Sequence, residues 1–335
     1  MRVLCQVRPD FLEYPGAETA QLLGTRPHLE KLGVKADVAA GFDAELWTYD
    51  VIHLFGTWAA APTYAHFQNA KLWGKPVLLS PFYSNPLDNL EWRRAEERQR
   101  LVAWWEVTNN LRREVLAETD LLAPASEQEA AMIRRDFKLA RPYQLVHPGV
   151  DRLYQHGEAR RFTARYGQSD FVLCVGRLEP QRNQLGLIEA LAGTDLPLVF
   201  VGPPGDPEYA EACATLGGAQ AFFFPALSPL ELADAYAAAR VFVAPGWEEA
   251  PGQASLAAGL AGCNVVVSDR AAVREHLGDD AWYCRPGDLS SIQAAVLMAW
   301  EAPRAGGLRT RLLDYTWERA AIETLRAYES LLERA

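Results

Sequence analysis

Two adjacent acids, Glu248 and Glu249, stand where the sequence pattern most favours ligand chemistry. They follow the apolar, β-branched run 241–244, which predicts a strand, and they precede an alanine-rich stretch that predicts a helix ending at Gly262. Because parallel sheets bind ligands at the carboxyl ends of their strands, this order places both acids at a ligand edge. The alternative interpretation is a solvated loop followed by an ordinary core helix.

The start of the same predicted helix is a second candidate feature. Pro251 and Gly252 open it, and the first backbone N–H groups, near Gly252, Gln253 and Ala254, have no partner inside a helix. Such N–H groups suit a phosphate. Carboxylates beside an anion site fit a ligand that carries both a phosphate and several hydroxyls, as a nucleotide-sugar does.

A second strand-to-helix turn carries two arginines. Gly176 follows the apolar run 171–175 and allows a close turn, and Arg177 and Arg182 lie in the turn itself. Guanidinium groups suit bidentate contacts with phosphate. If the two strands are neighbours, these cations face the Glu249 loop. The alternative is that both arginines make exposed salt bridges on the surface.

The elements that must position these residues form two successive arrays of alternating strands and helices. The expected strands are residues 3–7, 35–38, 50–55, 76–80, 120–124 and 144–147 in the first array, and 171–175, 196–201, 221–224, 241–244, 265–267 and 281–284 in the second. Alternation of this kind predicts an α/β protein with parallel sheets covered by helices on both faces. Two such domains leave a cleft between them, which is the default ligand site.

Composition limits the function classes. The chain has 335 residues, which favours two domains, and its formal net charge of -10 argues against a nucleic-acid partner. Its first residues are too short an apolar run for a signal peptide, and none of its apolar runs has the length of a membrane span. The five scattered cysteines predict reduced core thiols in a cytoplasmic protein.

Several motifs resemble the retaining glycosyltransferases of family 4, which have the GT-B fold. One is the segment 175–190, with the residues Val-Gly-Arg-Leu-Glu-Pro-Gln-Arg-Asn-Gln-Leu-Gly-Leu-Ile-Glu-Ala, and another is the block that begins at Glu249, which resembles the family's two glutamates separated by seven residues. Shorter matching segments are 15–17, 147–151, 266–268, 274–276 and 286–288. The resemblance covers most of the chain and is strongest over 171–290.

The resemblance implies two Rossmann-like βαβ domains with a cleft between them. Residues 1–150 would form the N-terminal, acceptor-side domain, and the last helix, 317–335, would cross back onto it. Residues 151–316 would form the C-terminal domain that binds the nucleotide-sugar donor.

The resemblance also implies roles for single residues. Arg177 and Arg182 would be catalytic and hold the donor diphosphate, with Arg182 where the family usually has Lys. Glu249, the third catalytic residue, would contact hydroxyls of the transferred sugar. The donor-binding residues that the resemblance implies are Gly16, Ala17, Gly176, Pro251, Gly252, Gln253 and Ala254.

One position departs from the family pattern. The second glutamate of the block, which typically binds the nucleotide ribose, is replaced by Ala257. Alanine accepts no hydrogen bond from a ribose hydroxyl, and a lost hydrogen bond to a charged group costs roughly 1.5–3 kcal/mol. This leaves three alternatives. Either a nearby group replaces the glutamate as the hydrogen-bond acceptor, or the ribose is held more weakly, or the chain has lost transferase activity.

Three residues of the first array are candidates for contact with the acceptor. Ser80 and Tyr83 lie at the end of the fourth predicted strand, and His53 lies in the third. The alternatives are a packed aromatic for Tyr83 and a structural role for His53. The family needs no metal, the sequence shows no metal-ligand spacing, and we expect neither a metal nor a cofactor.

These observations predict a metal-independent enzyme of glycan biosynthesis. It would move a hexose from a nucleoside diphosphate donor to a glycan or lipid-linked acceptor with retention of configuration. A lipid-linked acceptor leaves peripheral association with the inner face of the membrane open. The alternative, favoured by Ala257, is an inactive protein that binds a sugar nucleotide or a glycan. A dinucleotide-dependent oxidoreductase would also fit the sheets, but the sequence has no Gly-x-Gly-x-x-Gly after a strand.

Overall fold

The chain divides into two units, each built on its own parallel sheet. The computed structural model describes residues 1–247, 252–269, 271–304 and 306–334. Unit 1 comprises Met1–Val150 and Tyr315–Ala335, and unit 2 comprises Asp151–Asp314. The chain thus passes from unit 2 to unit 1 at 314/315, whereas the sequence-based boundary was 316/317.

The sheet of unit 1 has the strand order β2-β1-β3-β4-β5, and all its pairs are parallel. Its strands are β1 (Arg2–Gln6), β2 (Lys35–Ala39), β3 (Val51–Phe55), β4 (Val77–Ser80) and β5 (Leu121–Leu122). The strand order reverses between β1 and β3, so the topological switch point of this unit lies at their carboxyl ends.

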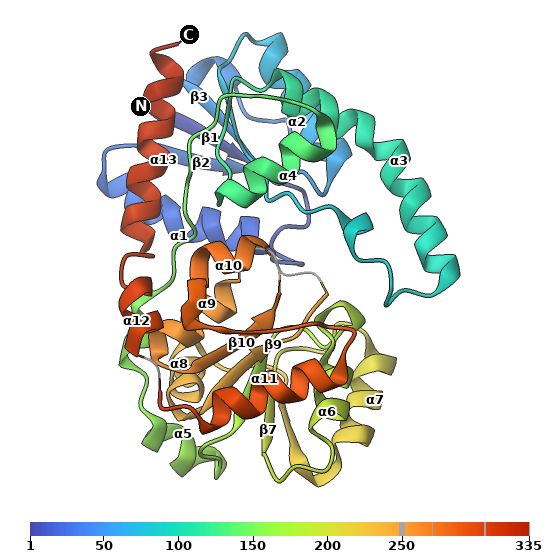
Figure 1. Cartoon of the computed structure of the whole chain (residues 1–335). Helices are drawn as coiled ribbons and strands as arrows, with labels where there is room; N and C mark the ends of the chain where they lie inside the picture. Colours follow the sequence, from blue (N-terminus) through green and yellow to red (C-terminus); the bar gives the residue numbers. More distant parts are fainter. Residues whose placement is uncertain (248–251, 270, 305, 335) are drawn as a thin grey trace. The chain divides into compact units, whose positions relative to one another are not determined.

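Five α-helices are described in unit 1 (Figure 1). They are α1 (Ala17–Lys31), α2 (Ala60–Leu72), α3 (Ala95–Glu118), α4 (Glu127–Phe137) and α13 (Trp317–Leu332). The last of these returns from the end of the chain and packs along α1. Gly24 and Gly149 leave room for the Trp317 ring, because a Cβ on either glycine would lie within 2.4 Å of it.

The sheet of unit 2 has the order β11-β10-β9-β6-β7-β8, again all parallel. Its strands are β6 (Val172–Val175), β7 (Leu198–Val201), β8 (Ala221–Phe224), β9 (Val241–Ala244), β10 (Asn264–Ser268) and β11 (Trp282–Cys284). Their β-branched and aromatic residues suit strands that are covered on both faces. Here the order reverses between β6 and β9, which places the switch point at those two strands.

Eight α-helices are described in unit 2 (Figure 1). They are α5 (Ala159–Tyr166), α6 (Gln184–Leu191), α7 (Pro207–Gly217), α8 (Pro229–Ala238), α9 (Gln253–Ala261), α10 (Ala271–Leu277), α11 (Leu289–Glu301) and α12 (Gly306–Leu312). Ser228 and Glu231 form a capping box at the start of α8, since each side chain accepts from the other residue's backbone N–H.

The predicted sixth strand of the first array, 144–147, is wrong. The segment runs extended beside β5 and makes two backbone hydrogen bonds with its surroundings, from Gln144 to Leu122 and from Val146 to Pro124. Pro142 and Pro124 lack an N–H and cannot donate, so a regular ladder does not form. The predicted reduced thiols agree with the structure: all five cysteines lie in its described part, are buried, and form no disulfide.

Candidate functional site

The two loops singled out in the second array leave neighbouring strands. Strands β6 and β9 pair directly, with Val172 opposite Val241 and Leu173 opposite Phe242. The loop after β6 and the loop after β9 therefore start at the same edge of the sheet, at its switch point. The sequence predicts that Arg177 and Arg182 face the loop after Ala244 if the two strands are neighbours. The pairing of β6 with β9 meets this condition.

The two loops are bonded to each other. The backbone N–H of Trp247 donates to the carbonyl of Gln181 at 2.8 Å. The side-chain amide of Asn183 donates to the carbonyls of Pro245 at 3.2 Å and of Pro286 at 2.9 Å. Asn183 itself has a φ of 57°, the left-handed region that asparagine tolerates better than most residues. It thereby connects the loops that follow β6, β9 and β11.

Glycine is required where the β6 loop meets the loop after β7. Gly202 has a φ of +152°, and a Cβ there would lie 2.1 Å from the carbonyl oxygen of Gly176. Gly176 has a φ of +149° and donates its N–H to Val201 at 2.9 Å. The backbones of these two turns therefore touch, and the contact fixes the start of the loop that carries Arg177.

Both arginines flank one carboxylate. Arg177 Nε lies 3.8 Å from one oxygen of Glu179, and Arg182 Nε lies 3.7 Å from the other. Both arginine side chains are partly exposed, while Glu179 is largely covered. Sequence reasoning did not single out Glu179, although a carboxylate between two arginines of one turn was a usable signal. Gln184 also supports the turn, because its amide donates to the carbonyl of Arg177 at 2.8 Å.

Helix α9 begins in the described residues that follow 248–251, which lie outside the described part of the chain. Gly252 is the N-cap, with a φ of 47°, and no side chain among the described residues caps the helix. Ser255 Oγ donates back to the Gly252 carbonyl at 2.9 Å. The side-chain nitrogen of Gln253 is buried without a hydrogen-bond partner among the described residues. The phosphate contacts expected at Gly252, Gln253 and Ala254 stay predictions.

Two predicted residues of this loop, Glu249 and Pro251, lie outside the described residues, as does Glu248. Their roles stay predictions. The residue that replaces the expected second glutamate, Ala257, is described: it lies in α9 and is 3% exposed. The side chain at this position is thus enclosed by protein.

Unit 1 has a pocket at its own switch point, with a volume of about 410 Å³. Its lining comes from the segments that follow β1, β3 and β4 and from the start of α1 and α2, namely Arg8, Asp10, Tyr14, Glu18, Phe55, Gly56, Trp58, Ala59 and Phe82. Sequence reasoning considered Trp58 for contact with an acceptor, with a core position as the alternative, and named none of the other lining residues as a ligand contact. Their only shared signal is position, since each segment follows a predicted strand.

The start of α1 is acidic, which bears on the phosphate contacts predicted for Gly16 and Ala17. Gly16 is the N-cap of α1, and a Cβ there would lie 2.3 Å from a carboxylate oxygen of Glu18. Arg8 holds this carboxylate, with its Nε 3.0 Å from Glu18 Oε1. A negative charge already occupies the helix start, so the geometry favours a hydroxyl over a phosphate there.

The three acceptor candidates are buried and bonded inside unit 1. His53 accepts or donates at both ring nitrogens, to Tyr328 Oη at 2.8 Å and to Ser80 Oγ at 2.9 Å. Tyr83 donates its hydroxyl to Asp136 at 2.8 Å. Burial lowers the pKa of His53 to about 3, and burial, with the Asp136 hydrogen bond, raises the pKa of Tyr83. This geometry assigns His53, Ser80 and Tyr83 a structural role.

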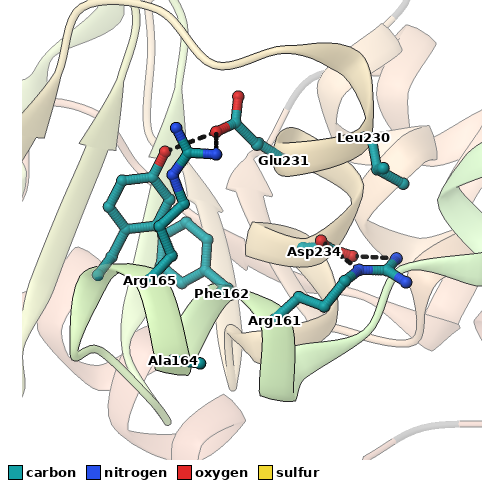
Figure 2. Close-up of a pocket in the computed structure, with 8 residues that line it drawn as sticks. Arg161, Phe162, Ala164, Arg165, Leu230, Glu231 and Asp234 are labelled. Atoms are coloured by element: carbon teal, nitrogen blue, oxygen red, sulfur yellow. Dashed lines mark hydrogen bonds and ion pairs between the residues drawn. The ribbon is translucent and has the colours of Figure 1, made fainter.

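A second pocket, between α5 and α8, is lined by charged groups that pair with one another. Figure 2 shows Arg161 turned toward Asp234 and Arg165 toward Glu231, at 2.7 Å and 2.6 Å. Tyr166 also donates to Glu231, at 2.8 Å. Because these charges already have partners, this pocket offers an incoming ligand little beyond apolar contact.

Within the described residues, no group of three or more His, Cys, Asp or Glu side chains is placed to hold a metal ion. No helix in that part of the chain has both the length and the apolar character needed to cross a membrane.

Comparison with known proteins identifies related sequences. Residues 156–315 match the family model described as glycosyl transferases group 1. The O-antigen chain mannosyltransferase B of Escherichia coli is 28% identical over 176 residues. That alignment covers 48% of this chain and 46% of the relative, so the match spans about half of the relative's length.

Solved structures of similar fold cover the whole chain. The sucrose-phosphate synthase of Thermosynechococcus elongatus superposes with a TM-score of 0.80 at 16% identity, over 100% of both chains. The Anabaena protein HepE, in complex with UDP and glucose, superposes with a TM-score of 0.75 at 16% identity, over 98% of this chain and 100% of that one. At such identities the likeness shows the fold, which is GT-B.

Proposed function

We propose that this protein is a glycosyltransferase with a nucleoside-diphosphate-sugar donor, because the chain has the GT-B fold and its residues 156–315 match the family model described as glycosyl transferases group 1. The donor would be bound by unit 2. The finer proposal is transfer of a hexose to a glycan or lipid-linked acceptor with retention of configuration, without a metal or cofactor.

One observation supports the donor site above the others. The loops after β6 and β9 leave neighbouring strands at the switch point and are hydrogen-bonded to each other. Arg177 and Arg182 stand in the first loop, and the uncapped start of α9 ends the second. Two guanidinium groups and a helix N-terminus at one edge of a sheet suit a diphosphate.

The same groups suit the chemical step. As the bond from the sugar's anomeric carbon to the diphosphate breaks, negative charge builds on the leaving phosphate, and Arg177, Arg182 and the α9 N–H groups stabilise it. The acceptor hydroxyl oxygen forms the new bond to the anomeric carbon. Its proton passes to an oxygen of the departing phosphate. The configuration is retained because the acceptor attacks the face of the sugar from which the phosphate departs.

The acceptor proposal rests on similarity. The Escherichia coli relative is named an O-antigen chain mannosyltransferase, which supports a glycan as acceptor. A lipid-linked glycan would also suit, and peripheral association with a membrane would follow from it.

A second candidate function is supported by Ala257. In this alternative the protein binds a sugar nucleotide or glycan without transferring it, because the alanine provides no hydrogen bond to the ribose. The two candidates differ in turnover and not in the location of the binding site.

A binding experiment tests the donor site. We expect UDP- or GDP-sugars to raise the Tm of the wild-type protein, and Arg177→Ala and Arg182→Ala each to weaken that binding. Loss of a hydrogen bond to a charged group costs roughly 1.5–3 kcal/mol, which corresponds to a roughly 10- to 100-fold higher Kd. Arg160→Ala, an exposed arginine of α5, is the matched control in the same unit.

Turnover then separates the two candidates. Slow hydrolysis of the bound donor, or transfer to acceptors in a lysate, supports the enzyme. Binding with neither reaction supports the inactive alternative. Unchanged binding in Arg177→Ala would show that the donor site lies elsewhere. Activity that EDTA abolishes would contradict metal independence.

A further inference from the structure

Asn183 stands at a position that is locally unfavourable for it. It is the N-cap of α6 and has a φ of 57° and a ψ of 35°, in the left-handed region that a residue with a Cβ adopts at a cost. An asparagine at an N-cap usually accepts a hydrogen bond from an N–H in the first turn of the helix. Among the described residues, the Asn183 side chain makes no such bond. Its contribution therefore lies outside α6.

The side-chain amide of Asn183 is bonded to two other loops. Its nitrogen donates to the carbonyl of Pro245 at 3.2 Å and to the carbonyl of Pro286 at 2.9 Å. Because an amide nitrogen carries two hydrogens, these bonds use both of them. Pro245 follows β9 directly, and Pro286 stands shortly after the end of β11. One side chain in the loop after β6 thus binds the loops that follow two other strands of the same sheet.

Helix α6 leaves room for this side chain. A Cβ on Gly186, in the first turn of α6, would lie 2.5 Å from Oδ1 of Asn183 and 3.0 Å from its Nδ2. A larger residue at position 186 would push the amide away from the two carbonyls that it binds. The segment Asn-Gln-Leu-Gly at 183–186 therefore contains both the donor and the space that the donor needs.

The loop after β9 also lies directly against the turn that carries the two arginines. A Cβ on Gly246 would lie 3.0 Å from the carbonyl oxygen of Gln181 and 3.4 Å from the Cα of Arg182. The N–H of Trp247 donates to that same carbonyl at 2.8 Å, and Ser268 Oγ donates to the carbonyl of Gly246 at 2.5 Å. The separation between the arginine turn and the start of this loop is therefore set by direct contacts.

The Trp247 ring contacts the third loop. A Cβ on Gly287 would lie 3.0 Å from Cη2 of the ring, so the indole packs on the backbone of the loop after β11. Asn183 binds that loop at the adjacent residue, Pro286. A movement of any of the three loops relative to the others would consequently change the environment of this indole.

We propose that Asn183 is a positioning residue of the donor site. Its amide holds the loops after β6, β9 and β11 in one arrangement. The turn with Arg177 and Arg182 and the start of the loop after β9 thereby keep a fixed separation before a donor binds. Groups that are ordered in advance lower the entropic cost of binding. The proposal rests on the proposed function, since the site that Asn183 positions is the donor site of unit 2.

Two variants remove the connection and keep the backbone. Asn183→Gly adopts the left-handed φ without steric cost, and Asn183→Asp keeps the size of the side chain but directs a carboxylate, which donates no hydrogen bond, at two carbonyls. We expect each variant to raise the Kd of a bound UDP- or GDP-sugar roughly 10-fold in isothermal titration calorimetry. The Tm of Asn183→Gly should stay close to that of wild type, which separates this loss from a loss of folding.

Asp170→Gly is the matched control. Asp170 also has a left-handed φ, of 49°, and lies exposed just before β6, at the opposite end of the strand from the arginine turn. This variant relieves the same kind of backbone strain and should leave the Kd of the donor unchanged.

A fluorine label measures the arrangement of the loops without a donor. In the full chain labelled with 5-fluorotryptophan, Trp247→Phe assigns the Trp247 resonance in ¹⁹F NMR. This resonance should shift in Asn183→Gly and Asn183→Asp and keep its position in Asp170→Gly. An unchanged resonance in both Asn183 variants would overturn the proposal, as would a shifted resonance with an unchanged donor Kd.

A double variant tests whether Asn183 acts through the arginine turn. The rise in Kd for Asn183→Gly combined with Arg177→Ala should be smaller than the product of the two single rises, because both changes affect the same contact with the diphosphate. A rise equal to that product would contradict the proposal. Absence of donor binding in wild type would instead contradict the proposed function, while a shifted Trp247 resonance would still support the connection of the three loops by Asn183.

Discussion

His53 is a buried polar residue at the centre of unit 1. Its two ring nitrogens bond Tyr328 and Ser80, and these partners come from α13 and β4. The imidazole is therefore fully used within the fold, and it joins the last helix of the chain to the middle of the sheet. Burial lowers the pKa of His53 to about 3, so the folded protein holds the ring neutral.

The stability of unit 1 should consequently depend on pH through His53. In the unfolded chain the imidazole protonates below about pH 6.5, while in the folded chain it stays neutral down to about pH 3. The contribution of the neutral His53 ring to the free energy of unfolding is therefore complete above about pH 6.5. Below that pH, the free energy of unfolding declines by roughly 1.4 kcal/mol per pH unit. Urea unfolding of wild type and His53→Gln at pH 7, 6, 5 and 4 should give a shallower decline for the variant.

An exposed histidine provides the comparison. His156 is an exposed residue on the turn Arg152–His156 of unit 2, and the stability of His156→Gln should decline with acid as steeply as that of wild type. Equal slopes for wild type and His53→Gln would contradict the buried, neutral state of His53.

Single-residue predictions from the sequence were most useful where chemistry and position agreed. Arg177, Arg182 and Gly252 follow strands that prove to be neighbours, so the edge they share could be predicted from alternation alone. The structural role of His53 could not be predicted from the sequence, because its partner Tyr328 is 275 residues away in the chain. A strand-end position does not tell which side of the sheet a side chain faces. For the same reason the pocket residue Arg8 had no local signal in the sequence.

At the scale of elements, the turn after β6 depends on the turn after β7. A Cβ on residue 202 would lie 2.1 Å from the carbonyl oxygen of Gly176 and 3.2 Å from the backbone nitrogen of Arg177. A strand end that carries functional arginines is thus positioned by the backbone of its neighbour and not by its own side chains.

Gly202→Ala should therefore disturb the donor site as well as the fold. Overpacking costs roughly 1–3 kcal/mol, and the positive φ adds strain. The expected result is a lower Tm together with weaker donor binding, measured by thermal shift at several donor concentrations. Gly193→Ala is the matched control, because Gly193 has a φ of +87° in the same unit but no atom within 4 Å of its Cβ position. It should lower Tm and leave donor affinity unchanged; an equal loss of affinity in both variants would refute the role of the contact.

The elements themselves were largely predictable, and the failures have a local cause. Strong periodicity and caps marked most helices, such as α8 with its Ser228 capping box. The charged sequence 87–118 favours one long helix, but α3 begins only at Ala95, after a short turn at Pro86–Asp88. The strand expected at 144–147 lacks donors at the prolines around it. In the second case proline, which lacks an N–H donor, overrode a pattern of apolar residues.

At the scale of the whole chain, the two segments that make up unit 1 are hydrogen-bonded to each other at the residues where the chain enters and leaves unit 2. The N–H of Val150 donates to the carbonyl of Tyr315 at 2.9 Å, and His147 contacts Glu323 of α13 at 3.0 Å. Helix α13 also supplies core residues to unit 1, among them Ala321, Tyr328 and Leu331. Unit 1 is therefore incomplete without the last residues of the chain, although they follow all of unit 2 in the sequence.

A chain that ends at Asp314 should accordingly lose unit 1 and keep unit 2. Removal of α13 uncovers the inner face of the unit 1 sheet, and each large apolar side chain that loses its burial costs roughly 1.5–3 kcal/mol. We expect hydrogen exchange to lose protection in β1 and β3 while β6 and β9 remain protected. A chain that ends at Glu333 retains α13 and should behave as wild type. Retained protection of β1 and β3 in the shorter chain would contradict the assignment of α13 to unit 1, because those strands would then be stable without the Tyr328 hydrogen bond to His53 and without the core contacts of Leu331.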